Sequence, residues 1–275
     1  MIVSRLFQWT TQQALQQIDY IYGQQGFAVV SYVYWAVIVR HRLLSDQLPH
    51  TAWHEALLSS DIVLPDGAAL LTRWMVAHRC GVVTWSSHLH NLNGTDFFVA
   101  LLEHYLALGW VNLVCYAVYD EKLGTQQWQL LTQAGEWLKQ HYGITWTYAQ
   151  DTSYLNDDMD DRDRHAMSQA CDPSLPTLMM VCRGVPRQEL WSAYHRSQFQ
   201  QYGIIVCNQG ATIDYWAGRE VRAPLWIRQL RLESLRRLAS DPRKNWTKFW
   251  VSFRMIGLII QTVYQAVCKK WYQWL

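Results

Sequence analysis

The chain lacks the sequence signatures of several common protein classes. Its six cysteines form no C-x-x-C pair and no zinc-binding spacing, and most lie in or beside apolar runs, as buried thiols do. No G-x-G-x-x-G follows a predicted strand, which argues against a nicotinamide oxidoreductase. The opening MIVSRLFQWTTQQ lacks the basic start and apolar stretch of a signal peptide. The cysteine pattern favours a reducing compartment.

Patterns typical of metal sites are also scarce. The acidic run DDMDDRD at 157–163 lacks the glycine and the terminal glutamate of a calcium loop, so it is most simply a solvated loop or the start of a helix. No Asp-x-Asp lies in a predicted strand-end loop. His88 and His90 have a spacing that permits metal ligation, but two loop histidines more often bind nothing. We therefore expect no metal and no other cofactor.

Hydrophobic and aromatic residues are abundant. Hydrophobic residues make up 50% of the 275, which is enough for a sizeable core in one large α/β domain or in a domain with an appendage. The 16 tryptophans and 15 tyrosines are high counts, and a chain rich in amphipathic aromatic side chains often acts near an interface.

Charge is distributed unevenly along the chain. Residues 1–218 hold 12 Lys and Arg against 19 Asp and Glu, whereas residues 219–275 hold 12 against 3, a net charge of +9. A basic tail on an acidic body indicates a polyanionic partner. Because large apolar residues alternate with the basic ones, an anionic membrane surface is favoured over nucleic acid. We predict a catalytic body at 1–218 and a helical, membrane-associating appendage at 219–275.

Within this tail, residues 249–267 are about as long as a transmembrane helix. Arg254, Gln261 and Gln265 interrupt the apolar run, and an arginine at the bilayer centre is costly. A helix lying in the membrane interface is therefore the favoured interpretation. A membrane-spanning helix and a buried core helix remain alternatives.

Strand and helix patterns alternate along the body. Short apolar or β-branched runs predict strands at 27–34, 111–119, 144–148, 177–182 and 203–207. Helical periodicity predicts helices at 11–22, 52–60, 66–78, 96–108, 124–142, 162–170 and 187–201, followed by a basic helix from 226 to 238. This order is typical of an α/β fold with a mostly parallel, Rossmann-like sheet covered by helices on both faces.

Three predicted strand ends are followed by candidate site residues. Asp66 follows the short apolar run 62–64, Gly184 to Glu189 follow strand 177–182, and Gly210 to Asp214 follow strand 203–207. Because ligands of such sheets bind at the carboxyl ends of the strands, we expect these loops to converge. Asp66 is a candidate general base, but from spacing alone the favoured interpretation is that it caps the following helix.

The loop at 184–189 offers groups suited to a nucleotide or a sugar. Gln188 supplies an amide and Glu189 a carboxylate at the start of a predicted helix, whose first backbone amides can receive an anion. The alternative is that Glu189 simply stabilises the first turn of that helix, where glutamate is common.

Several short motifs stand in a fixed order between about residues 10 and 245. They are Ser31, Pro65-Asp66-Gly67, Gly94-Thr95-Asp96, Gly184-Val185-Pro186-Arg187-Gln188-Glu189, Gly210 to Asp214, and Arg222-Ala223-Pro224 with Trp226-Ile227-Arg228. This ordered set resembles the motifs of the WecG/TagA/CpsF glycosyltransferases. An ordered set is far more specific than any one of its members.

The resemblance implies an inverting, metal-independent transfer of sugar from a nucleotide-sugar, typically UDP-linked, to a polyprenyl-diphosphate-linked acceptor. It places such a protein peripherally on the cytoplasmic face of the bacterial inner membrane, in cell-surface or exopolysaccharide synthesis. By the same resemblance, Asp66 is the general base with Ser31 near it, and Arg222 and Arg228 reach the diphosphate. The implied substrate-binding residues also include Gly184, Gln188, Glu189, Asp214 and Asp96.

Some positions depart from the family pattern. Val33 stands where the family has an asparagine, and Cys115, Cys182 and Ala211 stand where it has glycines. Side chains at glycine positions narrow the room for a phosphate or sugar that approaches closely. The donor pocket is therefore expected to be reshaped. A catalytically weakened scaffold or binding subunit of a polysaccharide assembly complex remains the alternative function.

Overall fold

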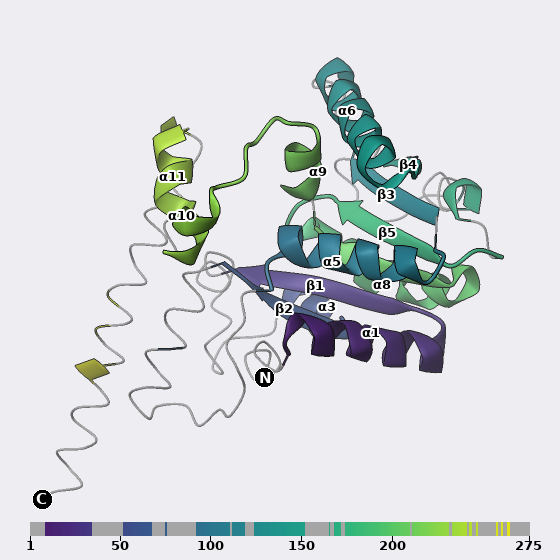
Figure 1. Ribbon diagram of the computed structural model, residues 1–275. Helices are drawn as coiled ribbons and strands as arrows, with labels where there is room; N and C mark the ends of the chain where they lie inside the picture. The colour runs from purple at the N-terminus through teal and green to yellow at the C-terminus, as the bar shows by residue number, and fades with distance from the viewer. Residues whose placement is uncertain are drawn as a thin grey trace, which may run out of the picture.

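The computed structural model describes residues 9–34, 52–67, 92–110, 112–118, 124–151, 168–171, 174–209, 211–230 and 233–240, with a few isolated positions. Within them, six strands form one sheet in the order β2-β1-β6-β5-β3-β4, and every pair of neighbours is parallel (Figure 1). The strands are β1 (Ala28–Tyr34), β2 (Ile62–Asp66), β3 (Asn112–Val118), β4 (Trp146–Asp151), β5 (Thr177–Cys182) and β6 (Ile204–Asn208). The prediction of a parallel α/β sheet is confirmed.

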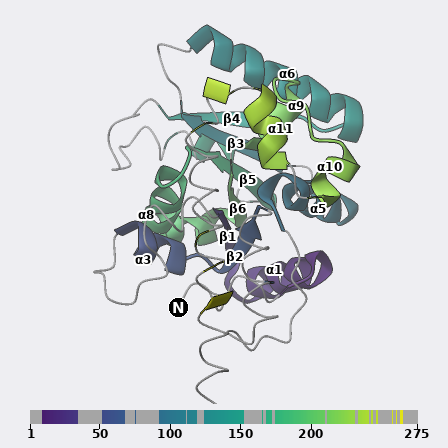
Figure 2. The ribbon, with the colours of Figure 1, turned by 90° about the vertical axis from the view of Figure 1, so that its left-hand side faces the viewer.

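Helices cover both faces of the sheet (Figures 1 and 2). One face carries α1 (Thr11–Gln25), α5 (Gly94–Ala107), α6 (Gly124–Tyr142) and α9 (Ala211–Trp216); the other carries α3 (Ala52–Leu58) and α8 (Arg187–Tyr202). In β6, Ile205 and Cys207 enter the first core, whereas Ile204 and Val206 enter the second. Burial on both faces explains why the strands are apolar without alternation.

Local sequence explains where α1 and α5 begin. Thr10 and Gln13 form a capping box at the start of α1, with Thr10 Oγ1 accepting from the Gln13 amide at 3.2 Å. Asn93 caps α5, and its Oδ1 accepts from the Asp96 amide at 3.0 Å. Such caps each contribute about 1 kcal/mol. The Asn93 cap fixes the first turn of α5, and with it the position of Asp96.

The basic helix expected from 226 to 238 is divided into two. The structure contains α10 (Leu225–Gln229) and α11 (Glu233–Ser240), with Leu230 outside both. The amide of Leu230 donates to the carbonyl of Trp226 at 3.0 Å and closes α10. The prediction of one continuous helix is therefore wrong.

Two predicted segments lie largely outside the described residues. The helix predicted at 66–78 does not begin at its expected start, because Asp66 ends β2 and Gly67 is not helical; beyond Gly67 this stretch is described only at Met75. The tail from 247 onward is described only at isolated positions. Among the described residues, no helix has the length and apolar character needed to cross a membrane. The stretch 249–267 and the division at residue 219 therefore remain predictions.

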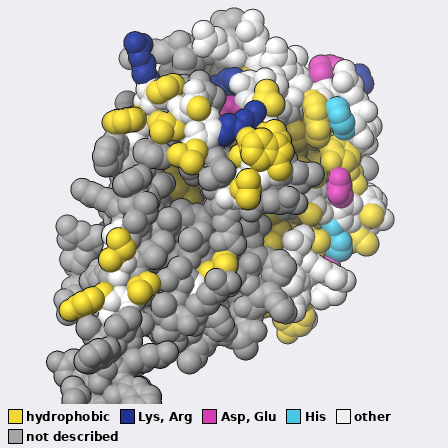
Figure 3. Space-filling view, turned by 60° about the vertical axis from the view of Figure 1, so that its left-hand side comes forward, with side chains coloured by type: hydrophobic (Ala, Val, Ile, Leu, Met, Phe, Trp, Pro, Cys, Tyr) yellow, Lys and Arg dark blue, Asp and Glu magenta, His cyan; other side chains and the backbone are white. Residues whose placement is uncertain are grey.

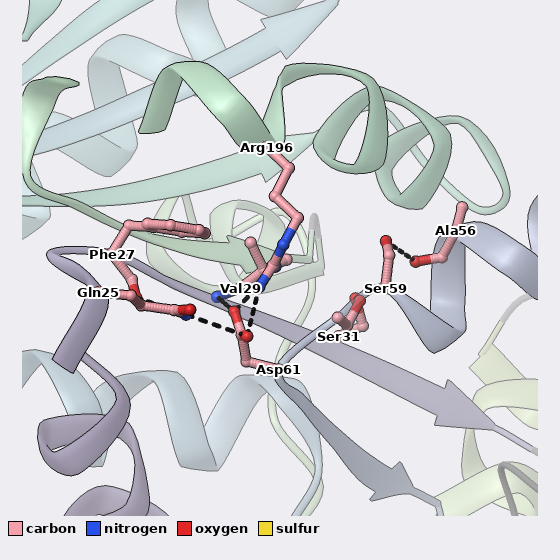
Figure 4. A network of polar contacts seen from close by, with 9 residues as sticks. Gln25, Phe27, Val29, Ser31, Ala56, Ser59, Asp61 and Arg196 are labelled. Atoms are coloured by element: carbon pink, nitrogen blue, oxygen red, sulfur yellow. Dashed lines mark hydrogen bonds and ion pairs between the residues drawn. The ribbon is translucent and has the colours of Figure 1, made fainter. Parts of the chain in front are cut away.

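A cluster of polar contacts lies at the amino end of β2 (Figure 4). Asp61 accepts two hydrogen bonds from the guanidinium of Arg196, which comes from α8. The same carboxylate accepts from the Val29 amide at 2.8 Å and from Gln25 Nε2 at 3.1 Å. The Arg196 guanidinium also lies 4.8 Å from the ring centre of Phe27. This cluster joins α1, β1, β2 and α8.

Candidate functional site

The carboxyl ends of β1, β2, β5 and β6 lie side by side at the other edge of the sheet. The register pairs Tyr34 with Asp66, and it pairs Asn208 with Val181 on one side and with Ser31 on the other. The loops that follow β2, β5 and β6 therefore begin at the same edge, as expected for a parallel sheet.

Asp66 is the last residue of β2 and is partly buried. Gly67 follows it with φ at +98°, a left-handed conformation that favours glycine. The Pro-Asp-Gly turn is thus present as a turn that leaves the sheet at its carboxyl edge. The helix that Asp66 would cap lies outside the described residues. The role of Asp66 as a general base and its role as a helix cap both stay predictions.

Ser31 lies deeper in the sheet than Asp66. It pairs with Val63, three residues before the Tyr34–Asp66 pair, and it is fully buried. Its Oγ lies 2.7 Å from Ser60 Oγ and accepts from Asn208 Nδ2 at 2.9 Å. The structure therefore places Ser31 in a buried polar network and does not bring it beside Asp66.

Gln188 and Glu189 form the first turn of α8, after a turn at Gly184 with φ at +73°. The Gln188 amide donates to the Gly184 carbonyl at 3.0 Å. Gln188 Nε2 donates to Glu189 Oε1 at 2.9 Å and to the Asn208 carbonyl at 2.8 Å. The structure thus joins these two expected site residues and buries both of them.

The environment of Glu189 is unusual for a carboxyl group. Burial raises its pKa to about 7, even though hydrogen bonds from Gln188 and Trp53 act in the opposite direction. Trp53 Nε1 donates to Glu189 Oε2 at 3.2 Å across the contact between α3 and α8. Glu189 therefore changes its charge near neutral pH, a property found often, though not only, at functional sites.

Three residues of this network were missed from the sequence: Asn208, Ser192 and Trp53. Ser192 Oγ donates to Asn208 Oδ1 at 2.6 Å, and Asn208 also contacts Ser31. The position of Asn208 at the end of an apolar strand, directly before the 210–214 motif, was an available signal. Nothing in the sequence pairs Trp53 with Glu189, which lies 136 residues further on.

Asp96, Arg222 and Arg228 are brought together above the first turn of α5. The Asp96 carboxylate binds Arg222 Nη2 and lies 3.3 Å from Arg228 Nη1. Asn93 Nδ2 donates to Asp96 Oδ2 at 2.8 Å. Burial raises the pKa of Asp96, but the Asn93 hydrogen bond and the two arginines outweigh it and hold the pKa below its usual value. Asp96 is therefore ionised at neutral pH.

The segment after β6 connects this cluster to the sheet. Asp214 in α9 forms an ion pair of 2.7 Å with Arg219, at the start of the segment that carries Arg222. Gln209 Oε1 accepts from Thr212 Oγ1 at 2.8 Å. A Cβ on Gly94 would lie 3.0 Å from that same oxygen, so glycine allows α5 to approach the β6–α9 loop closely.

Metal-ligating groups do not gather in the described part of the chain. No three His, Cys, Asp or Glu side chains there are arranged to hold an ion. His88, His90 and the acidic run at 157–163 lie outside the described residues.

The protein is thus of the parallel α/β class, and carboxylate, amide and arginine side chains lie near the carboxyl ends of its strands. A family model described as the Glycosyl transferase WecG/TagA/CpsF family matches residues 3–268. The chain belongs to this glycosyltransferase family. The resemblance found in its motifs is thereby confirmed. Comparison with curated proteins finds no match to this chain.

Proposed function

We propose that this protein is an inverting glycosyltransferase that moves a sugar from a UDP-linked donor to a polyprenyl-diphosphate-linked acceptor. The observation that carries the proposal is the gathering of three groups at one edge of the sheet. These are Asp66 at the end of β2, the Gln188–Glu189 pair in the first turn of α8, and the arginines held by Asp96. They supply a base, polar contacts for a nucleotide-sugar, and positive charge for a diphosphate.

In the proposed reaction, Asp66 removes the proton from the acceptor hydroxyl. The hydroxyl oxygen then forms a bond to the anomeric carbon of the donor sugar from the face opposite the diphosphate. The bond between that carbon and the diphosphate oxygen breaks, and the nucleoside diphosphate leaves with the bonding electron pair. General-base catalysis of this kind contributes roughly 10²–10⁴ in rate.

Negative charge on the leaving diphosphate requires positive partners. Arg222 and Arg228 are suited to this task because a guanidinium offers several donors in a plane that matches phosphate oxygens. Asp214, Gly184 and the Gln188–Glu189 pair line the strand ends from which a nucleotide-sugar would be held. Because Gln188 and Glu189 are buried, their proposed contact with donor requires the α8 amino end to open toward it.

A peripheral position on the cytoplasmic face of the inner membrane fits the surface formed by α10 and α11. Figure 3 shows hydrophobic and basic side chains next to one another on this face. Val221, Trp226, Leu230 and Leu235 are all exposed there. Exposed apolar residues among basic ones are typical of a surface that lies on anionic lipid. Such docking would bring the arginine cluster to a lipid-linked acceptor.

The test is a transfer assay with a panel of radiolabelled UDP-sugars and a short-chain lipid-diphosphate acceptor. We expect label to move to the lipid with at least one donor, and Asp66→Asn to lose that transfer while it keeps UDP binding. Thermal stabilisation by UDP provides the binding measurement. Turnover by Asp66→Asn within a few-fold of wild type would leave Asp66 as a helix cap.

One observation favours a catalytically weakened binding subunit instead. The Cys182 thiol, at an expected glycine position, donates to the Gln209 carbonyl at 3.0 Å and links the ends of β5 and β6. A side chain there occupies space that a glycine would leave to the donor. UDP binding without transfer by any donor, together with transfer restored by Cys182→Gly, would support this second function.

A further inference from the structure

Two buried side chains at the carboxyl edge of the sheet have polar atoms that are not hydrogen-bonded. Tyr32 in β1 is 5% exposed, and Gln209, directly after β6, is 6% exposed. Neither the Tyr32 hydroxyl nor Gln209 Nε2 has a hydrogen-bond partner among the described residues. Because a buried polar group without a partner costs free energy, two such groups at one edge require an explanation.

The Tyr32 side chain lies on the same face of the sheet as Asp66. Tyr32 pairs with Leu64 in the strand register, and Asp66 follows Leu64 by two residues, which returns it to that face. The Phe97 ring of α5 packs edge-on against the Tyr32 ring, with ring centres 6.4 Å apart. Burial, the Cys207 thiol and the Asp66 carboxylate all raise the pKa of Tyr32 well above its ordinary value. The hydroxyl therefore keeps its proton and can donate it.

Gln209 reaches the same place from the β6–α9 loop. Its Oε1 accepts from Thr212 Oγ1 at 2.8 Å, which fixes the side-chain amide and leaves its N–H groups to donate elsewhere. A Cβ on Gly94 would lie 3.0 Å from Gln209 Oε1 and 3.5 Å from Tyr32 Cγ. Tyr32 and Gln209 therefore both lie against Gly94, at the start of α5.

This position is between the proposed base and the proposed diphosphate site. On one side, Tyr32 shares a face of the sheet with Asp66, which lies on the neighbouring strand. On the other side, Asn93, which precedes Gly94, accepts through Oδ1 from Arg222 Nη2 at 3.0 Å. In an inverting transfer, the base and the leaving diphosphate lie on opposite faces of the anomeric carbon. The donor sugar therefore occupies the space between them.

We propose that Tyr32 and Gln209 bind a hydroxyl group of the donor sugar and thereby determine which sugar the protein accepts. The role rests on the proposed function. The Tyr32 O–H and the Gln209 N–H groups are donors, and a sugar hydroxyl oxygen accepts from both. Because both groups are buried, the sugar reaches them when the carboxyl edge opens, as donor contact with Gln188 also requires. A sugar without that hydroxyl leaves the two donors unpaired and binds more weakly.

The first measurement compares UDP with a panel of UDP-sugars, which includes UDP-glucose and UDP-galactose. Calorimetry on the full chain in detergent gives each affinity, and we expect wild type to prefer one sugar of the panel. Tyr32→Phe and Gln209→Leu should each weaken binding of that UDP-sugar about tenfold or more, the scale of a hydrogen bond to a buried group, and leave UDP affinity within a few-fold of wild type. Unchanged affinity for the UDP-sugar in both variants would overturn the assignment, as would equal binding of the whole panel by wild type.

Deoxy analogues of the preferred UDP-sugar, each without one hydroxyl, identify the group that is bound. The analogue without that hydroxyl should bind wild type about tenfold or more weakly than the parent sugar. It should bind Tyr32→Phe about as well as the parent sugar does, because the contact is already absent there. Equal losses with the two proteins for every analogue would contradict a contact between Tyr32 and the sugar.

Stability without ligand separates this role from one in the scaffold. The Tyr32 hydroxyl has no partner to lose, so Tyr32→Phe should raise the urea midpoint of unfolding. Tyr105→Phe is the matched control, because Tyr105 is buried in the same core but its hydroxyl donates to Asp19 at 2.8 Å. This control should lower the midpoint and leave UDP-sugar affinity unchanged. A lower midpoint in Tyr32→Phe, with equal losses of affinity for UDP and UDP-sugar, would make Tyr32 a scaffold residue and overturn the assignment.

The outcome is separable from that of the proposed function, since these measurements need no acceptor and no turnover. Absence of transfer in the donor screen, with sugar selectivity that still depends on Tyr32, would overturn the glycosyltransferase proposal and support the assignment. Transfer by wild type, with sugar selectivity unchanged in both variants, would support the glycosyltransferase proposal and overturn the assignment.

Discussion

Asp61 at the amino ends of the strands and Asp96 at their carboxyl ends are both aspartates bound by arginine. Asp61 is 12% exposed, and its oxygens are taken by Arg196, the Val29 amide and Gln25 (Figure 4). Asp96 is 47% exposed, and one of its two arginines is bound only through long contacts. An aspartate–arginine pair is thus shielded from solvent at the amino ends of the strands and accessible to solvent at their carboxyl ends.

The two aspartates differ in burial and in the number of partners that their oxygens contact, so one ion pair is closed within the scaffold and the other is open to solvent. At the amino edge, every bond of Asp61 joins elements of the scaffold, so a ligand would have to break the fold to reach it. At the carboxyl edge, Asp96 holds positive charge where solvent can enter. Changes at the amino edge should affect stability, and changes at the carboxyl edge should affect binding and turnover.

The largest effect is expected on turnover when Asp66, at the carboxyl end of β2, is replaced. Asp66→Asn should lower turnover by about 10²–10⁴-fold, because the acceptor proton would have no base to receive it. The free energy of unfolding should change little, since Asp66 ends its strand at the open edge. Steady-state transfer assays and urea unfolding of the same preparation measure both quantities. A large loss of stability would place Asp66 in the scaffold.

Asp61→Asn should show the reverse pattern. Removing one partner of this partly buried ion pair should cost about 1–3 kcal/mol, because the Arg196 charge and the Val29 amide lose their acceptor. Urea unfolding should report this loss, while the affinity for UDP in the remaining folded protein stays within a few-fold of wild type. Adding Arg196→Met to Asp61→Asn should cost little more, since the pair is already broken. Lost UDP affinity at full stability would contradict the contrast between the two edges.

Glu189 offers a pH test of the carboxyl edge. Burial raises the pKa of Glu189 in the folded protein to about 7, from an ordinary value of 4.5, so folding favours its protonated form. The contribution to stability is complete below pH 4.5, declines as the pH rises toward 7, and is lost above it. The total change is on the order of 3 kcal/mol.

Glu189→Gln should remove that decline, because glutamine carries no charge to bury. Urea unfolding of both proteins from pH 4.5 to 8 measures the difference between them. The free energy of unfolding of the variant, relative to that of wild type, should therefore increase as the pH rises. Parallel stability profiles for the two proteins would show that the Glu189 carboxyl does not titrate in this range.

The sequence was sufficient to predict the sheet but not the order of its strands. The run at 177–182 was placed with its observed bounds because it is apolar throughout and is followed closely by Gly184. The position of β6 between β1 and β5 depends on how whole strands pack, and no local pattern records that. Strand identity is a local property, whereas strand order is a property of the fold.

The candidate site was predictable as a set of loops but not as a set of contacts. Asp66, Gln188 and Asp214 follow strand ends, which periodicity locates. The pairing of Asp96 with Arg222 joins residues 126 positions apart, and the depth of Ser31 follows from the strand register, which pairs it with Val63, three residues before Asp66. Burial and pairing decide those contacts, and both arise only when the chain has folded.

The smallest expected effect concerns the exposed apolar residues next to the arginine cluster. Trp226 is 60% and Leu230 61% exposed on α10 and directly after it, whereas Leu108 is 59% exposed at the far end of α5. If the α10 side lies on the membrane, Trp226→Gln and Leu230→Gln should each weaken binding to anionic liposomes by up to about tenfold. Leu108→Gln should leave it unchanged. None of the three should alter the free energy of unfolding by more than about 0.5 kcal/mol, as is usual for exposed positions. Co-sedimentation over a series of lipid concentrations measures the binding, and equal losses at Leu108 and Leu230 would show that the membrane does not select this face.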